Sequence, residues 1–130
     1  MQFALDSNTV SYALRDQGGV AARLRTLGPV PIALPSVVVF ELRFGLVRLG
    51  RHRHADAFER MVGALTVIDF DAEAADHAAR IRVQLDAQGT PIGLADLLIA
   101  ATARRHGCTL VTHNTREFSR VPDLTLDDWY

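Results

Sequence analysis

A short stretch near the start of the chain decides the fold: Phe3-Ala4-Leu5-Asp6-Ser7-Asn8. Its three apolar residues predict a short buried strand that ends at Asp6. Ser7 or Asn8 then offers an N-cap for a helix that continues to about Arg15. The chain therefore begins with a strand followed by a helix, and Asp6 stands at the carboxyl end of the strand.

The same alternation continues to the end of the chain. Further short apolar strands are predicted at residues 32–34, 66–68, 109–112 and 124–126, with helical patterns between them. Short strands that alternate with helices predict an α/β fold with a parallel sheet covered on both faces. At 130 residues and 48% hydrophobic content, we expect one domain over residues 1–130.

Composition excludes several classes of protein. Cys108 is the only cysteine, so an intramolecular disulfide and a thiolate metal cluster are excluded, and we expect a buried structural thiol. All 14 basic residues are arginine, which excludes the P-loop and pyridoxal enzymes that need a lysine. The start lacks a secretory signal and no stretch is apolar across membrane thickness, so we expect a soluble cytoplasmic protein without membrane association.

A formal net charge of −1 is unfavourable for binding nucleic acid, because phosphate contacts call for a basic surface. If three carboxylates converge on a metal ion, however, the rest of the chain is slightly positive. Several arginines could then face phosphate: Arg51, Arg53, Arg104, Arg105, Arg116 and Arg120.

Three acids stand where ligands bind in α/β proteins. Asp6 follows the first strand, at the edge where open sheets bind their ligands. Glu41 interrupts an apolar run in a predicted helix, where its charge needs compensation. Asp96 lies in the first turn of an apolar helix, whose dipole should help to keep it ionised. Three such acids could form the all-oxygen site that Mg²⁺ or Mn²⁺ prefers.

Each acid also has a simpler explanation. Asp6 could only cap a helix, Glu41 could face solvent, and Asp96 could only stabilise the helix dipole. Asn114, which begins Asn114-Thr115-Arg116-Glu117, is explained by a capping box before a short helix.

Four segments in order and spacing resemble the PIN-domain ribonucleases, and within them the VapC-like toxins of type II toxin–antitoxin pairs. They are FALDSN at 3–8, FELRFG at 40–45, PIGLADLLIAA at 91–101 and LVTHNTREF at 110–118. The resemblance implies a PIN-like α/β/α sandwich with a central, mostly parallel sheet of four to five short strands. It also implies RNA as the substrate, a VapB-like antitoxin as a partner, and a homodimer.

The resemblance further implies an active site. Asp6 and Asp96 would be the main ligands of Mg²⁺, with Mn²⁺ as an alternative, and Glu41 would be a third acid. Asn114 stands where many family members carry a fourth acid. Hydrolysis would proceed by in-line attack of metal-activated water, giving 5′-phosphate and 3′-hydroxyl ends. Arg116 would contact the substrate phosphate.

Three other functions compete with this one. The chain could keep the fold but be a weakly active or inactive module that binds RNA or antitoxin, which the missing fourth acid makes conceivable. It could be a metal-independent ribonuclease that uses two of its five histidines as acid and base. A Mg²⁺-dependent phosphatase of another α/β family would usually carry an Asp two residues after the first, where this chain has Asn8.

Overall fold

The structure is a computed structural model that describes residues 2–28, 30–50 and 53–130. Its elements are, in chain order, β1 (Phe3–Leu5), α1 (Ser7–Leu14), α2 (Val20–Thr26), β2 (Ile32–Pro35), α3 (Ser36–Leu49), α4 (Ala55–Ala64), β3 (Thr66–Ile68), α5 (Ala72–Ala87), α6 (Leu94–Arg105), β4 (Thr109–Val111), α7 (Thr115–Phe118) and β5 (Leu126–Asp127). Arg51, one of the arginines considered for phosphate binding, lies outside the described residues.

The five strands form one parallel sheet in the order β3-β2-β1-β4-β5. This confirms the predicted parallel sheet. The position of the last strand was predicted incorrectly: β5 begins at Leu126 rather than two residues earlier. Leu126 and Asp127 are the residues that pair with Leu110 and Val111 of β4.

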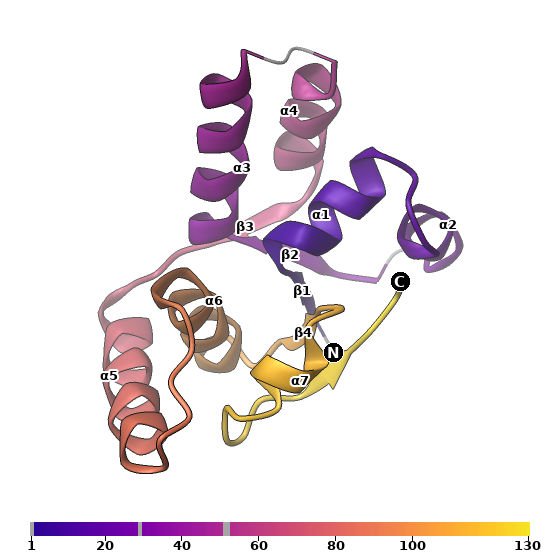
Figure 1. Ribbon diagram of the computed structural model, residues 1–130. Coiled ribbons are helices and arrows are strands. Elements are labelled where there is room, and N and C mark those ends of the chain that lie inside the picture. The colour runs from indigo at the N-terminus through magenta and orange to yellow at the C-terminus, as the bar shows by residue number, and fades with distance from the viewer. Residues whose placement is uncertain (1, 29, 51–52) are drawn as a thin grey trace.

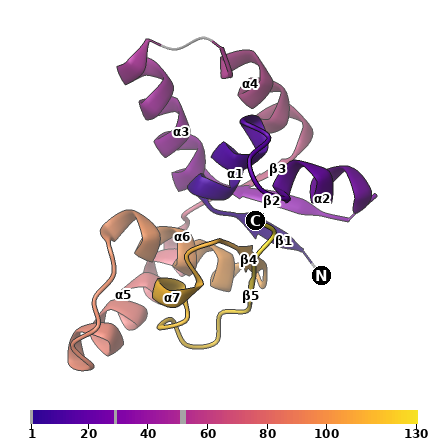
Figure 2. The ribbon, with the colours of Figure 1, turned by 45° about the vertical axis from the view of Figure 1, so that its right-hand side comes forward.

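Helices cover the sheet on both faces. In the two views of Figures 1 and 2, α1 to α4 lie on one face, and α5, α6 and α7 lie on the other. The α/β/α sandwich is therefore confirmed. Helices α5 and α6 pack side by side, and α6 also contacts β2 and β4.

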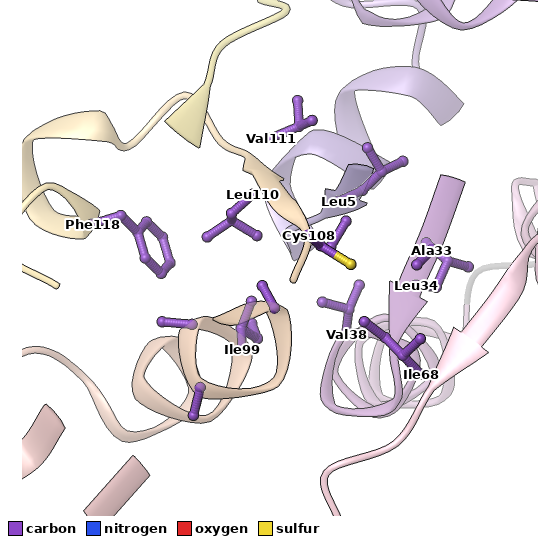
Figure 3. Close-up of a cluster of buried hydrophobic side chains, with 14 of the residues drawn as sticks. Leu5, Ala33, Leu34, Val38, Ile68, Ile99, Cys108, Leu110, Val111 and Phe118 are labelled. Atoms are coloured by element: carbon purple, nitrogen blue, oxygen red, sulfur yellow. The ribbon is translucent and has the colours of Figure 1, made fainter. Parts of the chain in front are cut away.

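The core lies on both faces of the sheet, as Figure 3 shows. Leu5 and Leu34 point to one face of the sheet and Leu110 to the other, because the register pairs Leu110 with Ala4. These three side chains, and Val38 of α3, Ile99 of α6 and Phe118 of α7, are all nearly or fully buried. Fully burying a side chain of this kind stabilises the fold by about 1.5–3 kcal/mol. Helix α6 is buried along most of its length, as its apolar sequence predicted.

Cys108 points into the same cluster and is 4% exposed (Figure 3). Burial raises the pKa of its thiol, which disfavours the reactive thiolate. The prediction of a buried structural thiol is confirmed. In the described part of the chain, every helix is too short or too polar to span a bilayer.

The direction of the connections reverses between β1 and β4. From β1 the chain continues to β2, toward one edge of the sheet, and from β4 it continues to β5, toward the opposite edge. In open α/β sheets such a reversal leaves a crevice beyond the carboxyl ends of the two strands. Hydrogen bonds hold these ends together: Asp6 N–H donates to Val111 O at 3.2 Å, and Thr9 Oγ1 donates to the same oxygen at 3.0 Å.

Candidate active site

Asp6 lies at this reversal and is 4% exposed. Its backbone is extended, and its Oδ1 accepts a hydrogen bond from Thr9 N–H at 2.9 Å, so Asp6 is the N-cap of α1. The prediction of Ser7 or Asn8 as the cap was wrong. Among the described residues, Oδ2 of Asp6 has no hydrogen-bond donor, so the cap leaves one carboxylate oxygen available.

Glu41 is half-buried in α3, and its charge does find a partner. Ser7 Oγ donates a hydrogen bond to Glu41 Oε1 at 2.5 Å. Ser7 directly follows Asp6, so this bond ties the carboxylate of α3 to the start of α1. A fully solvated Glu41 is thereby excluded.

Asp96 is half-buried in the first turn of α6. Burial raises the pKa of its carboxyl to about 6, with further contributions from the negative charges of Glu117, Glu41 and Asp6. The helix dipole was expected to help keep Asp96 ionised. Burial and three like charges oppose that effect, although a carboxyl with a pKa of about 6 is still mostly ionised at pH 7. The same shift means that Glu117, Glu41 and Asp6 are all close enough to Asp96 to repel its negative charge.

Glu117 is the acid that the sequence analysis missed as a site residue. It is half-buried in α7, and it is the charged group with the largest effect on Asp96. The sequence did contain a signal for Glu117. It follows the end of the fourth strand by six residues, and the fourth strand lies beside the first, which Asp6 follows.

Asn114 occupies the N-cap position of α7 but makes no side-chain cap bond. Its Nδ2 donates to Glu117 Oε2 at 2.7 Å instead, while its backbone N–H donates to Thr112 Oγ1 at 3.0 Å. The predicted capping box was wrong in its bonding, although the short helix is present. Asn114 therefore holds the Glu117 carboxylate in place.

Across the described ranges, none of these four acids has a basic side chain within ion-pair distance. Arg116 is exposed on α7, beside Glu117 in sequence, and forms no ion pair with another described residue. Their negative charges are thus left without a cationic partner from the chain.

Two of the arginines considered for phosphate binding are engaged elsewhere. Arg104 donates to His77 Nδ1 and to Pro122 O, and Arg105 pairs with acids of the loop and first turn of α5. Both lie in the last turn of α6, whose first turn carries Asp96. A 12-residue helix is about 18 Å long, so these two arginines lie far from the acids.

The acids do not form a closed cage. Within residues 2–28, 30–50 and 53–130, no three carboxylate, imidazole or thiol side chains make a ready ligand set for a metal ion. Mg²⁺ commonly keeps several waters and takes one or two carboxylates directly. The arrangement therefore suits a hydrated cation better than a fully dehydrated one.

Comparison with known proteins decides the family. The family model of the PIN domain matches residues 3–124. The chain belongs to the PIN-domain family. It is 35% identical to the tRNA(fMet)-specific endonuclease VapC of Shigella flexneri and 32% identical to that of Salmonella typhimurium, in both cases over 99% of this chain and 98% of the relative.

A solved structure of VapBC2 from Rickettsia felis, bound to a promoter DNA fragment, contains a chain with the same PIN fold. It superposes with a TM-score of 0.91 at 32% identity over the whole of both chains. The resemblance to the VapC-like group that the four sequence segments indicated is thereby confirmed.

Proposed function

We propose that this PIN-domain chain is a divalent-metal-dependent endoribonuclease and the toxin of a toxin–antitoxin pair. The observation that carries the proposal is the convergence of Asp6, Glu41, Asp96 and Glu117 at the switch point of the sheet, without a basic partner among the described residues. Structural acids are normally paired or solvated. Four buried or half-buried acids, three of which repel Asp96, call for a cation.

Mg²⁺, with Mn²⁺ as the alternative, fits the donor set of this site. All four side chains offer carboxylate oxygens, which hard cations prefer. Asp6 and Asp96 would be its main protein ligands, and Glu41 would act directly or through water. Asn114 would act by orienting Glu117, with which it shares a hydrogen bond.

A bound divalent cation supplies an activated water and stabilises charge on the phosphate oxygens. The chain's own residues fix the geometry. The bond from Thr9 N–H orients Asp6, that from Ser7 orients Glu41, and that from Asn114 orients Glu117. Preorganised groups of this kind lower the cost of reaching the transition state.

Arg116 is the candidate for contact with the substrate. It is exposed on α7, next to Glu117 in sequence, and free of an ion pair among the described residues, so its guanidinium could reach a phosphate of bound RNA. Two relatives are named as tRNA(fMet)-specific endonucleases, and initiator tRNA is therefore the first substrate to assay.

An antitoxin would bind along α3. Two hollows there share Ser36 and Phe40, and one of them reaches past Glu41 to the start of α6. We call the two together the α3 groove, after their apolar lining residues: Val37, Val39, Phe40, Phe44, Val47, Leu94 and Leu98. Phe40 is 66% exposed and Val47 is 82% exposed. Exposed apolar surface of this extent is typical of a protein interface. Related solved structures are toxin–antitoxin complexes, which supports a VapB-like partner. The homodimer remains a prediction, and sedimentation velocity of the isolated chain would test it.

The experiment is cleavage of end-labelled RNA with Mg²⁺, with Mn²⁺ and with excess chelator, followed by analysis of the product ends. The proposal predicts cleavage only with a divalent cation, with 5′-phosphate and 3′-hydroxyl ends. A 2′,3′-cyclic phosphate formed in chelator would instead support the histidine mechanism. Binding of RNA or antitoxin without cleavage in any cation would support the inactive module.

A further inference from the structure

Three aromatic rings from distant parts of the chain gather on one surface of the molecule. They belong to Tyr12 of α1, His113 after β4, and Tyr130. The rings of His113 and Tyr130 stack with centroids 4.2 Å apart and planes 22° from parallel. Tyr12 meets both edge-on, at 4.8 Å from Tyr130 and 6.2 Å from His113. We call these three residues the ring cluster.

Hydrogen bonds fix the ring cluster in place. His113 Nδ1 lies 2.9 Å from Asp128 Oδ2, and the other oxygen of Asp128 accepts from Tyr130 N–H at 3.0 Å. Gln17 Nε2 donates to the hydroxyl of Tyr130 at 3.1 Å. Rings held this way lose little conformational freedom when they bind a partner.

The cluster is open to solvent although its members are aromatic. The side chain of His113 is 48% exposed, and Tyr130 is 46% exposed. The guanidinium of Arg15 lies over the ring of Tyr12 at 5.8 Å, which adds a positive charge to the same surface. Exposed rings next to an arginine are the combination that single-stranded nucleic acid binds by stacking.

The chain path connects the cluster to the segments that carry the acids. His113 directly precedes Asn114, whose side chain holds Glu117. It also follows by two residues Val111, whose carbonyl accepts bonds from Asp6 and Thr9. Helix α1 begins at Asp6 and carries Tyr12 less than two turns later. The C-terminal segment reaches this surface from β5, as Figure 2 shows.

We propose that the ring cluster stacks an unpaired nucleobase of the RNA substrate beside the bond that is cleaved. The proposal rests on the ribonuclease function and adds to it a binding site that determines which RNA conformations are accepted. A chain with a formal net charge of −1 and an acidic centre gains little affinity from charge alone. Stacking supplies affinity that does not depend on net charge.

Tyr130 also has a purely structural task. A Cβ atom added at Gly18 would lie 2.8 Å from its ring, so Tyr130 closes tightly over the turn between α1 and α2. Removing Tyr130 would therefore disturb the fold. His113 is the better residue to vary, because its bond to Asp128 joins two partly exposed side chains, and such surface bonds contribute little to stability.

The test compares wild type, His113→Ala and His113→Phe, with His106→Ala as the matched control. His106 lies at the C-terminal end of α6, away from the cluster, where it contacts Asp69 O. The probe is a short single-stranded RNA that the wild type cleaves, and the same RNA with an abasic nucleotide on either side of the cleaved bond. All variants are first checked for an unchanged thermal midpoint.

We expect His113→Ala to raise KM about tenfold with little change in kcat, and His113→Phe to restore most of the loss because it keeps a ring. One of the two abasic RNAs should raise KM for the wild type by a similar factor and should remove the difference between wild type and His113→Ala. The control should behave as wild type.

Equal KM values for wild type and His113→Ala would overturn the inference while the ribonuclease function stands. The same holds if His113→Ala weakens binding of the antitoxin but not of the RNA, because the cluster would then be a protein-docking surface. If the wild type cleaves no RNA with Mg²⁺ or Mn²⁺, the proposed function fails and the inference fails with it.

Discussion

The side-chain amide of Asn114 donates a hydrogen bond to Oε2 of Glu117 at 2.7 Å, one turn apart in α7. Asn114 stands where many PIN-domain proteins carry an acid, and by itself it adds no charge. The bond to Glu117 shows how Asn114 can still contribute to the candidate site. Its amide orients the carboxylate of Glu117, whose negative charge raises the pKa of Asp96. We therefore propose Glu117 as the fourth acid of the candidate site.

Replacing Glu117 with Gln should lower kcat/KM for RNA cleavage by tenfold or more, because the fourth charge of the site is lost while its shape is kept. It should also lower the pKa of Asp96, since Glu117 is the charged group that raises it most. Steady-state kinetics and an NMR titration of the Asp96 carboxyl measure the two effects. Glu73→Gln on α5 is the control, because Glu73 is exposed and pairs with Arg105. Unchanged activity in Glu117→Gln would contradict a role for this acid.

The stability of the chain should depend on the charge of Asp96. Its pKa rises from 3.8 to about 6 on folding, so the folded state binds more protons than the unfolded state between these values, and stability falls as pH rises through this range. Asp96→Asn removes the penalty. The variant should therefore be more stable than wild type at pH 7, by about 1 kcal/mol after allowance for solvent screening of a half-buried group.

Urea denaturation of wild type and Asp96→Asn at pH 4 and pH 7, without divalent cations, measures this effect. The difference in free energy of unfolding should be present at pH 7 and clearly smaller at pH 4, where the folded state is protonated and the unfolded state is about half protonated. A variant that is less stable than wild type at pH 7 would show that Asp96 is stabilised by its surroundings.

Binding of Mg²⁺ should compete with protonation of Asp96. Because the pKa of this carboxyl is about 6, the apparent affinity for Mg²⁺ should be several-fold higher at pH 7.5 than at pH 5.5. Isothermal titration calorimetry in two buffers of different ionisation enthalpy should detect proton release on binding near pH 6. Affinity that stays constant over this range would mean that Asp96 is not a ligand.

The α3 groove makes a prediction about the antitoxin. Phe44→Asp places a charge in the groove and should weaken binding of the cognate antitoxin at least tenfold while RNA cleavage persists, because Phe44 is 47% exposed and three residues from Glu41. Val83→Asp is the matched control, since Val83 is 70% exposed on α5, on the other face of the sheet. Surface plasmon resonance measures the binding. If Phe44→Asp binds the antitoxin as tightly as Val83→Asp does, the partner binds elsewhere.

Most of the fold could be predicted from the sequence because its signals are local. Short apolar runs predict the strands, and the long apolar run that begins near Asp96 predicts α6. The exact edges could not be predicted, since β5 is defined by its pairing with β4 and not by its own composition. Asp6 was predicted either to cap a helix or to serve a site. It does cap α1 through Oδ1, and one carboxylate can cap a helix and serve a site together.

The candidate site could be predicted only in part. Asp6, Glu41 and Asp96 were found because each acid stands out in an apolar stretch. Glu117 was not recognised because a capping box with Asn114 explained its presence in the sequence. Only the folded structure brings its charge close enough to raise the pKa of Asp96. The raised pKa of Asp96 could not be predicted either, because burial and like charges depend on neighbours that are distant in sequence.

The most direct test of the acidic centre is RNA cleavage by Asp6→Asn compared with Asp71→Asn. Both aspartates are N-caps whose side chains accept a backbone hydrogen bond, and asparagine caps helices about as well as aspartate, so both variants should keep the wild-type thermal midpoint to within a few degrees. We expect Asp6→Asn to lose more than about 100-fold of its cleavage rate and its growth toxicity, while Asp71→Asn retains both. Cleavage and toxicity that persist unchanged in Asp6→Asn would contradict a catalytic role of the acidic centre.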